Sequence, residues 1–324
     1  MNPANASAVS AVKEAGKKTE SRVAYNWRLY KKNKYLFLLL APVLIWYAIF
    51  HYGPMYGIQL AFKDFYMMKG IWGSPWVGFK HFHYLFAMSP DFWKIMRNTV
   101  VISFYHIAFG FPAPIILALL LNEVRISVFK KIAQTISYLP HFLSWVVIGG
   151  IMITLLSPST GVVNYIIEQL GFKPIYFLGN ESYFRFTLVA SGIWKEIGWG
   201  TIIYLAALAG VDLQLYEAAV LDGANRWKQT VHITIPSILP VITILLILRV
   251  GGVLDAGFDQ ILTLYSPAVY DKADVLDTYV YRVGLQNFQF SLTAAVGLFK
   301  NVIAVVLVLM TNYIVKKMGQ EGIT

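Results

Sequence analysis

Residues 35–62 read YLFLLLAPVLIWYAIFHYGPMYGIQLAF, a run without a single Lys, Arg, Asp or Glu. A helix needs about 20 mainly apolar residues to cross the hydrocarbon core of a bilayer. Backbone groups in lipid must be paired within their own segment, and the run lacks the alternation of a barrel strand. Five similar runs follow, at 98–121, 132–156, 186–210, 235–258 and 291–315. The sequence therefore predicts an all-α, polytopic transmembrane helical bundle with six spans.

The composition excludes several other classes of protein. Of 324 residues, 57% are hydrophobic and 14% are charged, whereas a soluble domain has about 25% charged residues. The absence of cysteine excludes disulfides, cysteine-ligated zinc, iron–sulfur clusters and thiol chemistry. The net charge of +10 does not indicate nucleic-acid binding, because the basic residues gather in the N-terminal segment and at the ends of apolar runs.

The Lys and Arg residues between the spans predict the orientation of the chain. With both termini in the cytoplasm, the inner segments hold 15 of these residues and the longer outer segments hold 9. We therefore expect an N-in, C-in arrangement in the lipid bilayer. It comprises a cytoplasmic basic tail at 1–34, a transmembrane domain at 35–315 with an inner loop at about 211–240, and a cytoplasmic tail at 316–324.

No catalytic constellation is visible in the sequence. It contains no phosphate-binding loop of the Gly-x-x-x-x-Gly-Lys-Ser/Thr type, no Gly-x-Gly-x-x-Gly turn and no His-Glu-x-x-His helix. The sequence therefore predicts that the chain is not an enzyme and binds no metal or cofactor. Energy for any active transport would come from another chain or from an ion gradient.

The inner loop between the fourth and fifth runs has an unusual composition. Residues 215–240 read LYEAAVLDGANRWKQTVHITIPSILP. The first part favours a helix, Gly223 interrupts it, and Pro236 stands near the start of the next span, where proline is tolerated. The pattern predicts a short helix, a turn and a second short helix along the inner membrane face. An ordinary amphipathic surface loop is the alternative interpretation.

A known motif resembles this loop. Glu-Ala-Ala, three residues, Gly, nine residues and Ile-Thr-Ile-Pro is similar to the EAA loop in the permease subunits of bacterial binding-protein-dependent type I ABC importers. The matching positions are Glu217, Ala218, Ala219, Asp222, Gly223, Ala224, Ile233, Ile235 and Pro236. Ile235 stands where that family often has Leu. The resemblance implies that the loop forms a coupling helix, which binds an ATP-hydrolysing subunit.

The likeness extends over about residues 28–324 and favours the oligosaccharide and polysaccharide branch of the family. Segments that resemble this branch include 61–65, 138–142, 193–199 and 277–282. Size and the basic tail are similar to those of the larger membrane subunit of an alginate importer. The resemblance implies that the protein is located in the bacterial cytoplasmic (inner) membrane. It also implies import of an oligo- or polysaccharide, with an alginate-like acidic saccharide favoured. It also implies a second homologous membrane subunit, an extracytoplasmic solute-binding protein and two ATPase subunits that carry ATP and Mg.

Charged residues at membrane depth indicate where the pathway lies, because they are costly in lipid and usually face a cavity. The candidates are the charged residues, the nearby aromatic residues and a glycine that weakens the fifth helix: Trp194, Lys195, Glu196, Trp199, Tyr204, Arg249, Gly252, Asp255 and Lys300. Aromatic rings stack on the apolar faces of sugars, and Arg249 or Lys300 would attract substrate carboxylates. Internal ion pairs and lipid-facing rings are the alternative.

The main rival function is an ion-gradient-driven secondary transporter of sugars. Six spans and buried charges would suit it, but it would leave the loop at 215–240 unexplained. A channel or membrane scaffold is a second rival, and it predicts neither ATP dependence nor a soluble binding protein.

Overall fold

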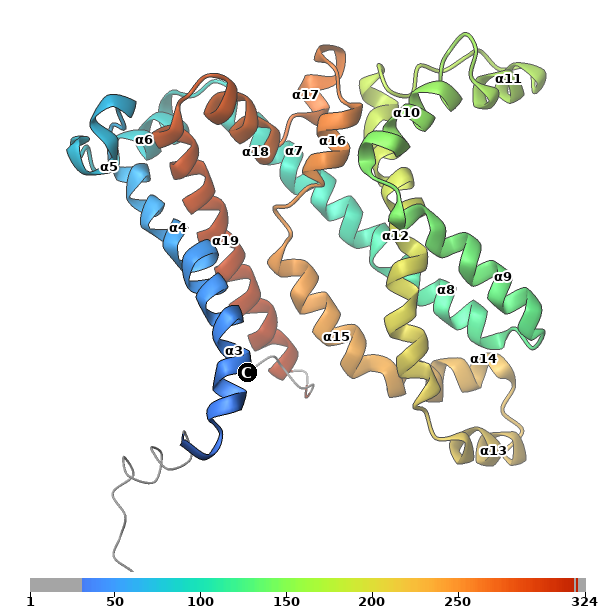
Figure 1. Ribbon diagram of the computed structural model, residues 1–324. Helices are drawn as coiled ribbons and strands as arrows, with labels where there is room; N and C mark the ends of the chain where they lie inside the picture. Colours follow the sequence, from blue (N-terminus) through green and yellow to red (C-terminus); the bar gives the residue numbers. More distant parts are fainter. Residues whose placement is uncertain (1–30, 318, 320–324) are drawn as a thin grey trace, which may run out of the picture. The chain divides into compact units, whose positions relative to one another are not determined.

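The computed structural model describes residues 31–317 and 319, and Figure 1 shows their course. Most of the predicted tails, 1–34 and 316–324, lies outside these described residues. The chain divides into two compact units, 1–58 and 59–324. Within the described part all regular elements are helical, and one isolated antiparallel bridge joins Lys63 to Trp76.

The first unit contains most of the first predicted span. Its elements are α3 (Lys34–Tyr47), the π-helical turn η1 (Ala48–Tyr52) and α4 (Gly53–Met55), and η2 (Tyr56–Phe62) continues into the second unit. No residue of α3 is buried within the chain. An apolar helix with no buried residue is suited to contact with lipid or with another membrane protein.

In the second unit, three helical segments are long and apolar enough to cross a membrane. They are Phe92–Glu123, Arg226–Gly251 and Phe290–Lys317. The first segment comprises α7 (Phe92–Tyr105), the π-helical turn η5 (His106–Gly110) and α8 (Pro112–Glu123). The second segment ends with α15 (Ile235–Gly251), and the third is α19 (Phe290–Lys317). These agree with the second, fifth and sixth predicted spans, except that α15 ends at Gly251 rather than near residue 258.

The third predicted span is broken instead of continuous. Helix α9 (Ser127–Tyr138), the 3₁₀ turn η6 (Leu139–Phe142) and α10 (Trp145–Leu155) replace it, and the two helical parts meet at 104°. Pro140 lies in the break. Proline has no N–H and disfavours helical geometry at the preceding residue. The backbone between α9 and α10 therefore needs hydrogen-bond partners from elsewhere.

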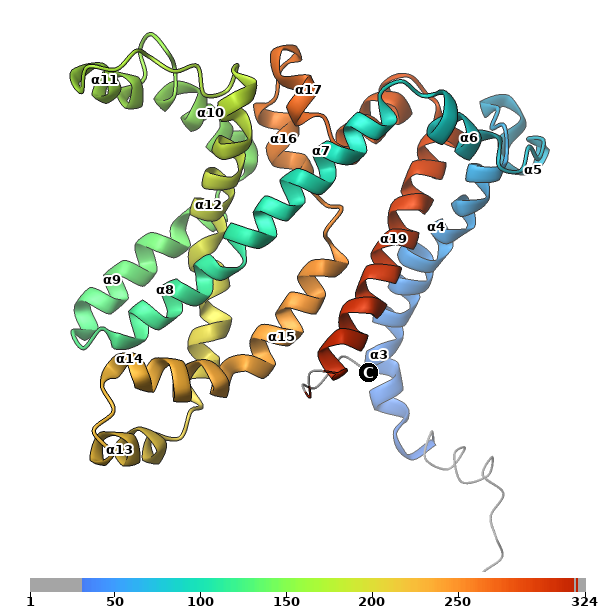
Figure 2. The same ribbon diagram turned by 180° about the vertical axis from the view of Figure 1, so that it is seen from behind.

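The fourth predicted span is α12 (Glu181–Ala209), which occupies a central position in the second unit. It packs against α8, α9 and α15, and Figure 2 shows it from behind. After α12 the chain bends by 71° into α13 (Leu213–Leu221). With each bent pair counted as one span, the described residues contain up to six spans.

Short helices connect these long elements. On the first connection they are η3 (Met67–Lys69), α5 (Gly70–Gly73), α6 (Lys80–His83) and η4 (Tyr84–Met88). The later ones are α11 (Val162–Gln169), α14 (Arg226–Gln229), η7 (Thr230–Thr234), α16 (Phe258–Leu264), η8 (Pro267–Val269), α17 (Tyr270–Ala273), α18 (Leu276–Val280) and η9 (Tyr281–Gln286). Both views place α13 and α14 at the end opposite α11, α16 and α17 (Figures 1 and 2).

Glycines on α12 allow its neighbours to approach closely. A Cβ atom at Gly198 would overlap the backbone carbonyl of Ser137 on α9, and one at Gly200 would lie 2.9 Å from Cγ of Pro114. Small residues at helix contacts are how membrane helices gain packing without a hydrophobic driving force.

Gly198→Ala is expected to destabilise the protein by about 2 kcal/mol, because the new methyl group must push the α9 backbone away. The measurement is the midpoint of thermal unfolding in detergent. Gly297→Ala in α19 is the matched control, since nothing lies within 4 Å of its Cβ position. The control should gain up to about 1 kcal/mol from helix propensity. Equal effects of the two changes would contradict the packing argument.

Candidate functional site

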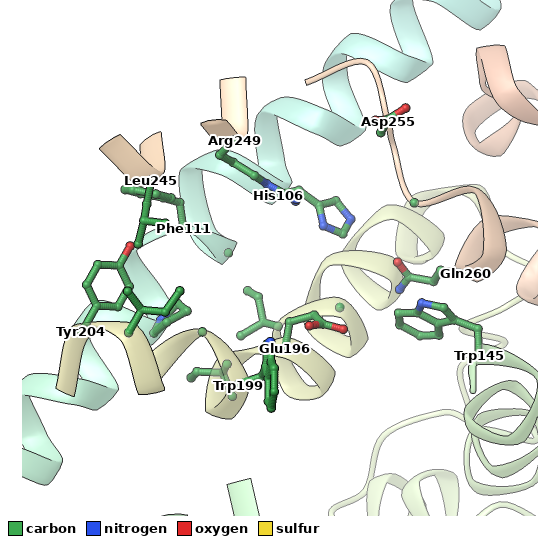
Figure 3. Close-up of a pocket in the computed structure, with 18 residues that line it drawn as sticks. His106, Phe111, Trp145, Glu196, Trp199, Tyr204, Leu245, Arg249, Asp255 and Gln260 are labelled. Carbon is green, nitrogen blue, oxygen red and sulfur yellow. The ribbon is translucent and has the colours of Figure 1, made fainter. Parts of the chain in front are cut away.

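A cavity of about 440 Å³ lies between η5, α8, α12 and α15. Five of the residues singled out from the sequence line it: Glu196, Trp199, Tyr204, Arg249 and Asp255. Figure 3 shows Glu196, Trp199 and Tyr204 along α12, with Arg249 projecting from the end of α15. The cavity thus combines aromatic rings with charged groups, the chemistry expected of a binding site for a polar ligand.

The first carboxylate in the cavity, Glu196, is already paired. Its Oε2 atom lies 2.9 Å from Nδ1 of His141, and its Oε1 atom lies 3.6 Å from the Lys195 ammonium. The His141 ring stacks on Trp199 at a centroid distance of 4.4 Å and an interplanar angle of 1°. This cluster joins the break after α9 to the cavity wall on α12.

Lys195 does not line the cavity but binds the backbone of that break. It is 6% exposed. Its Nζ atom donates to the carbonyl oxygens of His141 at 2.7 Å and Leu143 at 2.9 Å, with Pro140 at 3.5 Å. The ammonium therefore satisfies the carbonyl groups of His141 and Leu143, which accept from no N–H among the described residues, and adds to the bond that Pro140 accepts from the N–H of Leu143.

The predicted cations on the other helices have different surroundings. Lys300 on α19 contacts the carboxylates of both Asp255 and Asp277, the latter at 2.7 Å. It lines a separate pocket of about 240 Å³ together with Gly252. The Arg249 guanidinium makes no hydrogen bond or ion pair with any residue that the structure describes. Of the predicted cations, Arg249 alone faces the cavity and forms no ion pair with a carboxylate of the described residues.

Trp194 lies away from the cavity. It is half exposed and lines an apolar groove with side chains of α10 such as Ile151 and Met152. Sequence reasoning could not separate Trp194 from Trp199, because the two differ only in which face of α12 carries them.

Two polar residues of the cavity were missed by the sequence reasoning. They are His106, at the start of η5, and Gln260, in α16. A lone His in an apolar run is a weak signal, and Gln260 lies just beyond the predicted fifth span. The π-helical turn η5 places His106 at the cavity, and the fold of the segment after α15 places Gln260 there.

The predicted coupling loop forms the expected short helices and turn. The side chain of Asp212 caps α13 by accepting from the N–H of Gln214, and that of Asn225 caps α14 by accepting from the N–H of Lys228. Between them Gly223 has φ of +74°, which glycine adopts at little cost. Figure 1 shows the two helices projecting beyond the ends of the long helices.

Contacts within the second unit hold this loop in place. Arg226 pairs with Glu123 at the end of α8 at 2.5 Å, and the hydroxyl groups of Tyr216 and Thr234 lie 2.9 Å apart. Glu217 is exposed and has no ion pair or hydrogen bond with any other described residue. Leu221 and Trp227 are also largely exposed. The loop therefore presents two carboxylates without a partner among the described residues, those of Glu217 and Asp222, beside apolar side chains.

The remaining positions of the motif surround these groups. Ala218, Asp222 and Pro236 are exposed, whereas Ala219, Ala224, Ile233 and Ile235 are half-buried. The exposed members of the motif therefore lie on the surface of the described chain.

A helical membrane chain with an internal polar cavity and a projecting helical loop defines a polytopic transport protein. Residues 110–320 match the family described as "Binding-protein-dependent transport system inner membrane component". The chain belongs to this family, and it is therefore a multi-pass permease of the bacterial inner membrane. The predicted fold and family are confirmed.

Individual relatives are similar over nearly the whole chain. The Polygalacturonan/rhamnogalacturonan transport system permease protein YteP of Bacillus subtilis (strain 168) is 47% identical over 292 residues, which is 90% of this chain and 91% of the relative. Protein LplB of the same organism is also 47% identical, over 90% of this chain and 92% of its own length.

A solved structure is similar as well. The crystal structure of a bacterial alginate ABC transporter in complex with an alginate pentasaccharide-bound periplasmic protein contains a chain that is 42% identical, with a TM-score of 0.85. The match covers 92% of this chain and 99% of that chain.

Proposed function

We propose that this permease forms part of the pathway of an ATP-driven importer for an oligo- or polysaccharide, with an acidic, alginate-like saccharide as the favoured substrate. The observation that carries the proposal is the unpaired Arg249 guanidinium in a cavity that also contains Trp199 and Tyr204. The names of the relatives, which include a polygalacturonan/rhamnogalacturonan permease and an alginate transporter, support the same class of substrate.

The charge balance of the cavity explains why an acid is favoured. Glu196 is paired with His141 and approached by Lys195, and Asp255 is paired with Lys300. Among the charged side chains that line the cavity, Arg249 is then the one that has no oppositely charged partner among the described residues. In a site of low dielectric an unpaired cation is costly, and a ligand carboxylate relieves that cost through a charge-assisted hydrogen bond.

The coupling loop gives the proposed source of energy. Movement of ATPase subunits that bind α13 and α14 would shift α12 and α15, to which these short helices connect, between two packings. This scheme requires two ATPase subunits that carry ATP and Mg, a second homologous membrane subunit and an extracytoplasmic solute-binding protein. No step in it requires a cofactor on this chain or contact with nucleic acid.

The proposed orientation keeps both termini in the cytoplasm. The connection between α8 and α9 carries Arg125, and Lys130 and Lys131 follow in the first turns of α9. This connection lies at the same end as α13 and α14 (Figures 1 and 2). Helix α19 also ends there, with Lys316 and Lys317 in its last turn. Basic residues gathered at one end favour that end as the cytoplasmic one.

The direct test is uptake into proteoliposomes that contain the assembled transporter, the binding protein and ATP. A uronate oligosaccharide should enter only with ATP hydrolysis. Uptake that follows an ion gradient and needs no ATPase would instead support a secondary transporter.

Gly223→Val is expected to weaken capture of the ATPase subunit from solubilised membranes by about tenfold. A left-handed conformation costs an ordinary residue roughly 1–2 kcal/mol, and a β-branched side chain more. Gly223→Asn is the matched control, since Asn tolerates that conformation and nothing lies within 4 Å of the Cβ position. The measurement is the amount of ATPase that co-purifies with tagged permease. Equal losses for Val and Asn would show that the turn conformation is not what the ATPase requires.

A further inference from the structure

A small notch in the cavity wall is formed by Gly192, His106 and Gln260. The glycine lies on α12, and the other two side chains reach it from η5 and α16. A Cβ atom at Gly192 would lie 2.9 Å from Cε1 of His106, 3.5 Å from its Nδ1 and 3.7 Å from Oε1 of Gln260. Because Gly192 has no side chain, an imidazole and an amide oxygen border the same small space. Figure 3 shows His106 and Gln260 at the cavity.

Gln260 is held so that its oxygen faces this notch. The residue is 1% exposed. Its Nε2 atom donates to the carbonyl oxygen of Leu188 at 2.7 Å and to Oγ of Ser191 at 2.8 Å. Both N–H groups of the amide are used, so the amide cannot flip without losing them. Oε1 accepts no hydrogen bond from any described residue, which leaves a fixed acceptor without a donor.

His106 is the complementary group. Its Nε2 atom is buried and has no hydrogen-bond partner among the described residues. A buried N–H without an acceptor is rarer than an unused lone pair, which favours the tautomer with the proton on Nδ1, the nitrogen nearer the notch. His106 also begins the π-helical turn η5, and such turns occur often at functional sites.

We propose that this notch binds one free hydroxyl group of the sugar residue whose carboxylate contacts Arg249. The inference rests on the proposed function and adds the form of saccharide that is accepted. A hydroxyl group has one O–H donor and two acceptor lone pairs. It donates to Oε1 of Gln260 and accepts from Nδ1–H of His106, so that each unpaired group in the notch is satisfied.

Esterification removes this recognition. An O-acetyl group at that position has no O–H to donate, and it adds a carbonyl and a methyl group to a space in which a Cβ atom on Gly192 would already lie 2.9 Å from Cε1 of His106. His106 and Gln260 are therefore specificity-determining residues, and the pathway takes de-esterified saccharides. A polymer that carries acetyl esters must first pass a hydrolase that releases acetate from its hydroxyl groups.

The test measures the Kd of a uronate trisaccharide, with free or chemically O-acetylated hydroxyl groups, for the assembled transporter. The binding protein is omitted, so that its own selectivity does not enter. The wild type should prefer the free form at least about tenfold, as sites built to bind a hydroxyl do. His106→Phe keeps the ring but loses the donor, and Gly192→Ala fills the notch. Each variant should reduce the preference about fivefold, the worth of one hydrogen bond.

Ser103→Ala is the matched control. Ser103 Oγ is the other buried, unpartnered side-chain atom that the described residues contain, one turn before His106, and it does not line the cavity. Its removal should leave the preference unchanged. His106→Phe should also raise the thermal stability of the unliganded protein, because it removes a buried nitrogen without a partner.

The possible results separate the two proposals. A transporter that imports the saccharide but binds both forms equally, or a His106→Phe variant with an unchanged preference, would overturn the notch assignment and leave the proposed function standing. A wild-type transporter that neither binds nor imports the saccharide would overturn the proposed function, and the notch with it.

Discussion

Lys195→Met is expected to lower the stability of the protein by about 3 kcal/mol, because backbone carbonyl groups lose a charged donor and two of them have no other. The groups belong to His141, Leu143 and Pro140, in the break between α9 and α10. The carbonyl oxygen of Pro140 keeps the N–H of Leu143 as a donor, whereas those of His141 and Leu143 have no other donor among the described residues and lose their hydrogen bonds. The midpoint of thermal unfolding in detergent should fall by roughly 4–5 °C.

Lys131→Met provides the matched control for this substitution. Lys131 is an exposed residue near the start of α9, the helix that leads into the same break. Its replacement should change the stability by no more than about 0.5 kcal/mol, as surface substitutions usually do. If both variants unfold at the same temperature as the wild type, Lys195 does not hold the break, and it would again be a candidate for the pathway.

Arg249→Gln is expected to remove the preference for acidic saccharides. Gln retains hydrogen-bonding groups but not the positive charge, so uptake of a uronate oligosaccharide should fall at least about tenfold, the equivalent of one charge-assisted contact. Uptake of a neutral oligosaccharide of the same length should change little. The measurement is ATP-dependent uptake of the two saccharides by the same proteoliposomes.

Arg249→Lys is the matched control, since it keeps the charge while losing the planar guanidinium. It should retain most of the acid preference. A Gln variant that imports acidic and neutral saccharides in the wild-type proportion would show that Arg249 does not contact the substrate carboxylate. The substrate preference would then have to lie in the binding protein or in the second membrane subunit.

Lys300 illustrates how the structure separates residues that were equivalent in the sequence. Lys300 and Arg249 were both candidates to attract a carboxylate, since both are cations within apolar runs. Lys300 contacts two aspartates, Asp255 and Asp277. The partners lie 45 and 23 positions away in the sequence. No local pattern predicts such pairs, because they arise only when α19 packs against the segment that follows α15.

Local signals account for what the sequence determined by itself. The apolar runs predicted the helices, because backbone pairing in lipid must be satisfied within each segment. The residues from Glu217 to Pro236 predicted the helix, turn and helix of the coupling loop, since capping side chains and a glycine act on their immediate neighbours. Pro140 also carried a local signal for the break in the third span, which the count of apolar residues concealed.

Only the tertiary structure decided which polar groups remain available to a ligand. Lys195 binds the broken helix, Glu196 pairs with His141, and Arg249 alone among the predicted cations stays unpaired toward the cavity. The same packing placed His106 and Gln260 on either side of Gly192. The physical reason is that hydrogen bonds and ion pairs depend on distances between helices, whereas the sequence specifies directly only the faces and ends of each helix.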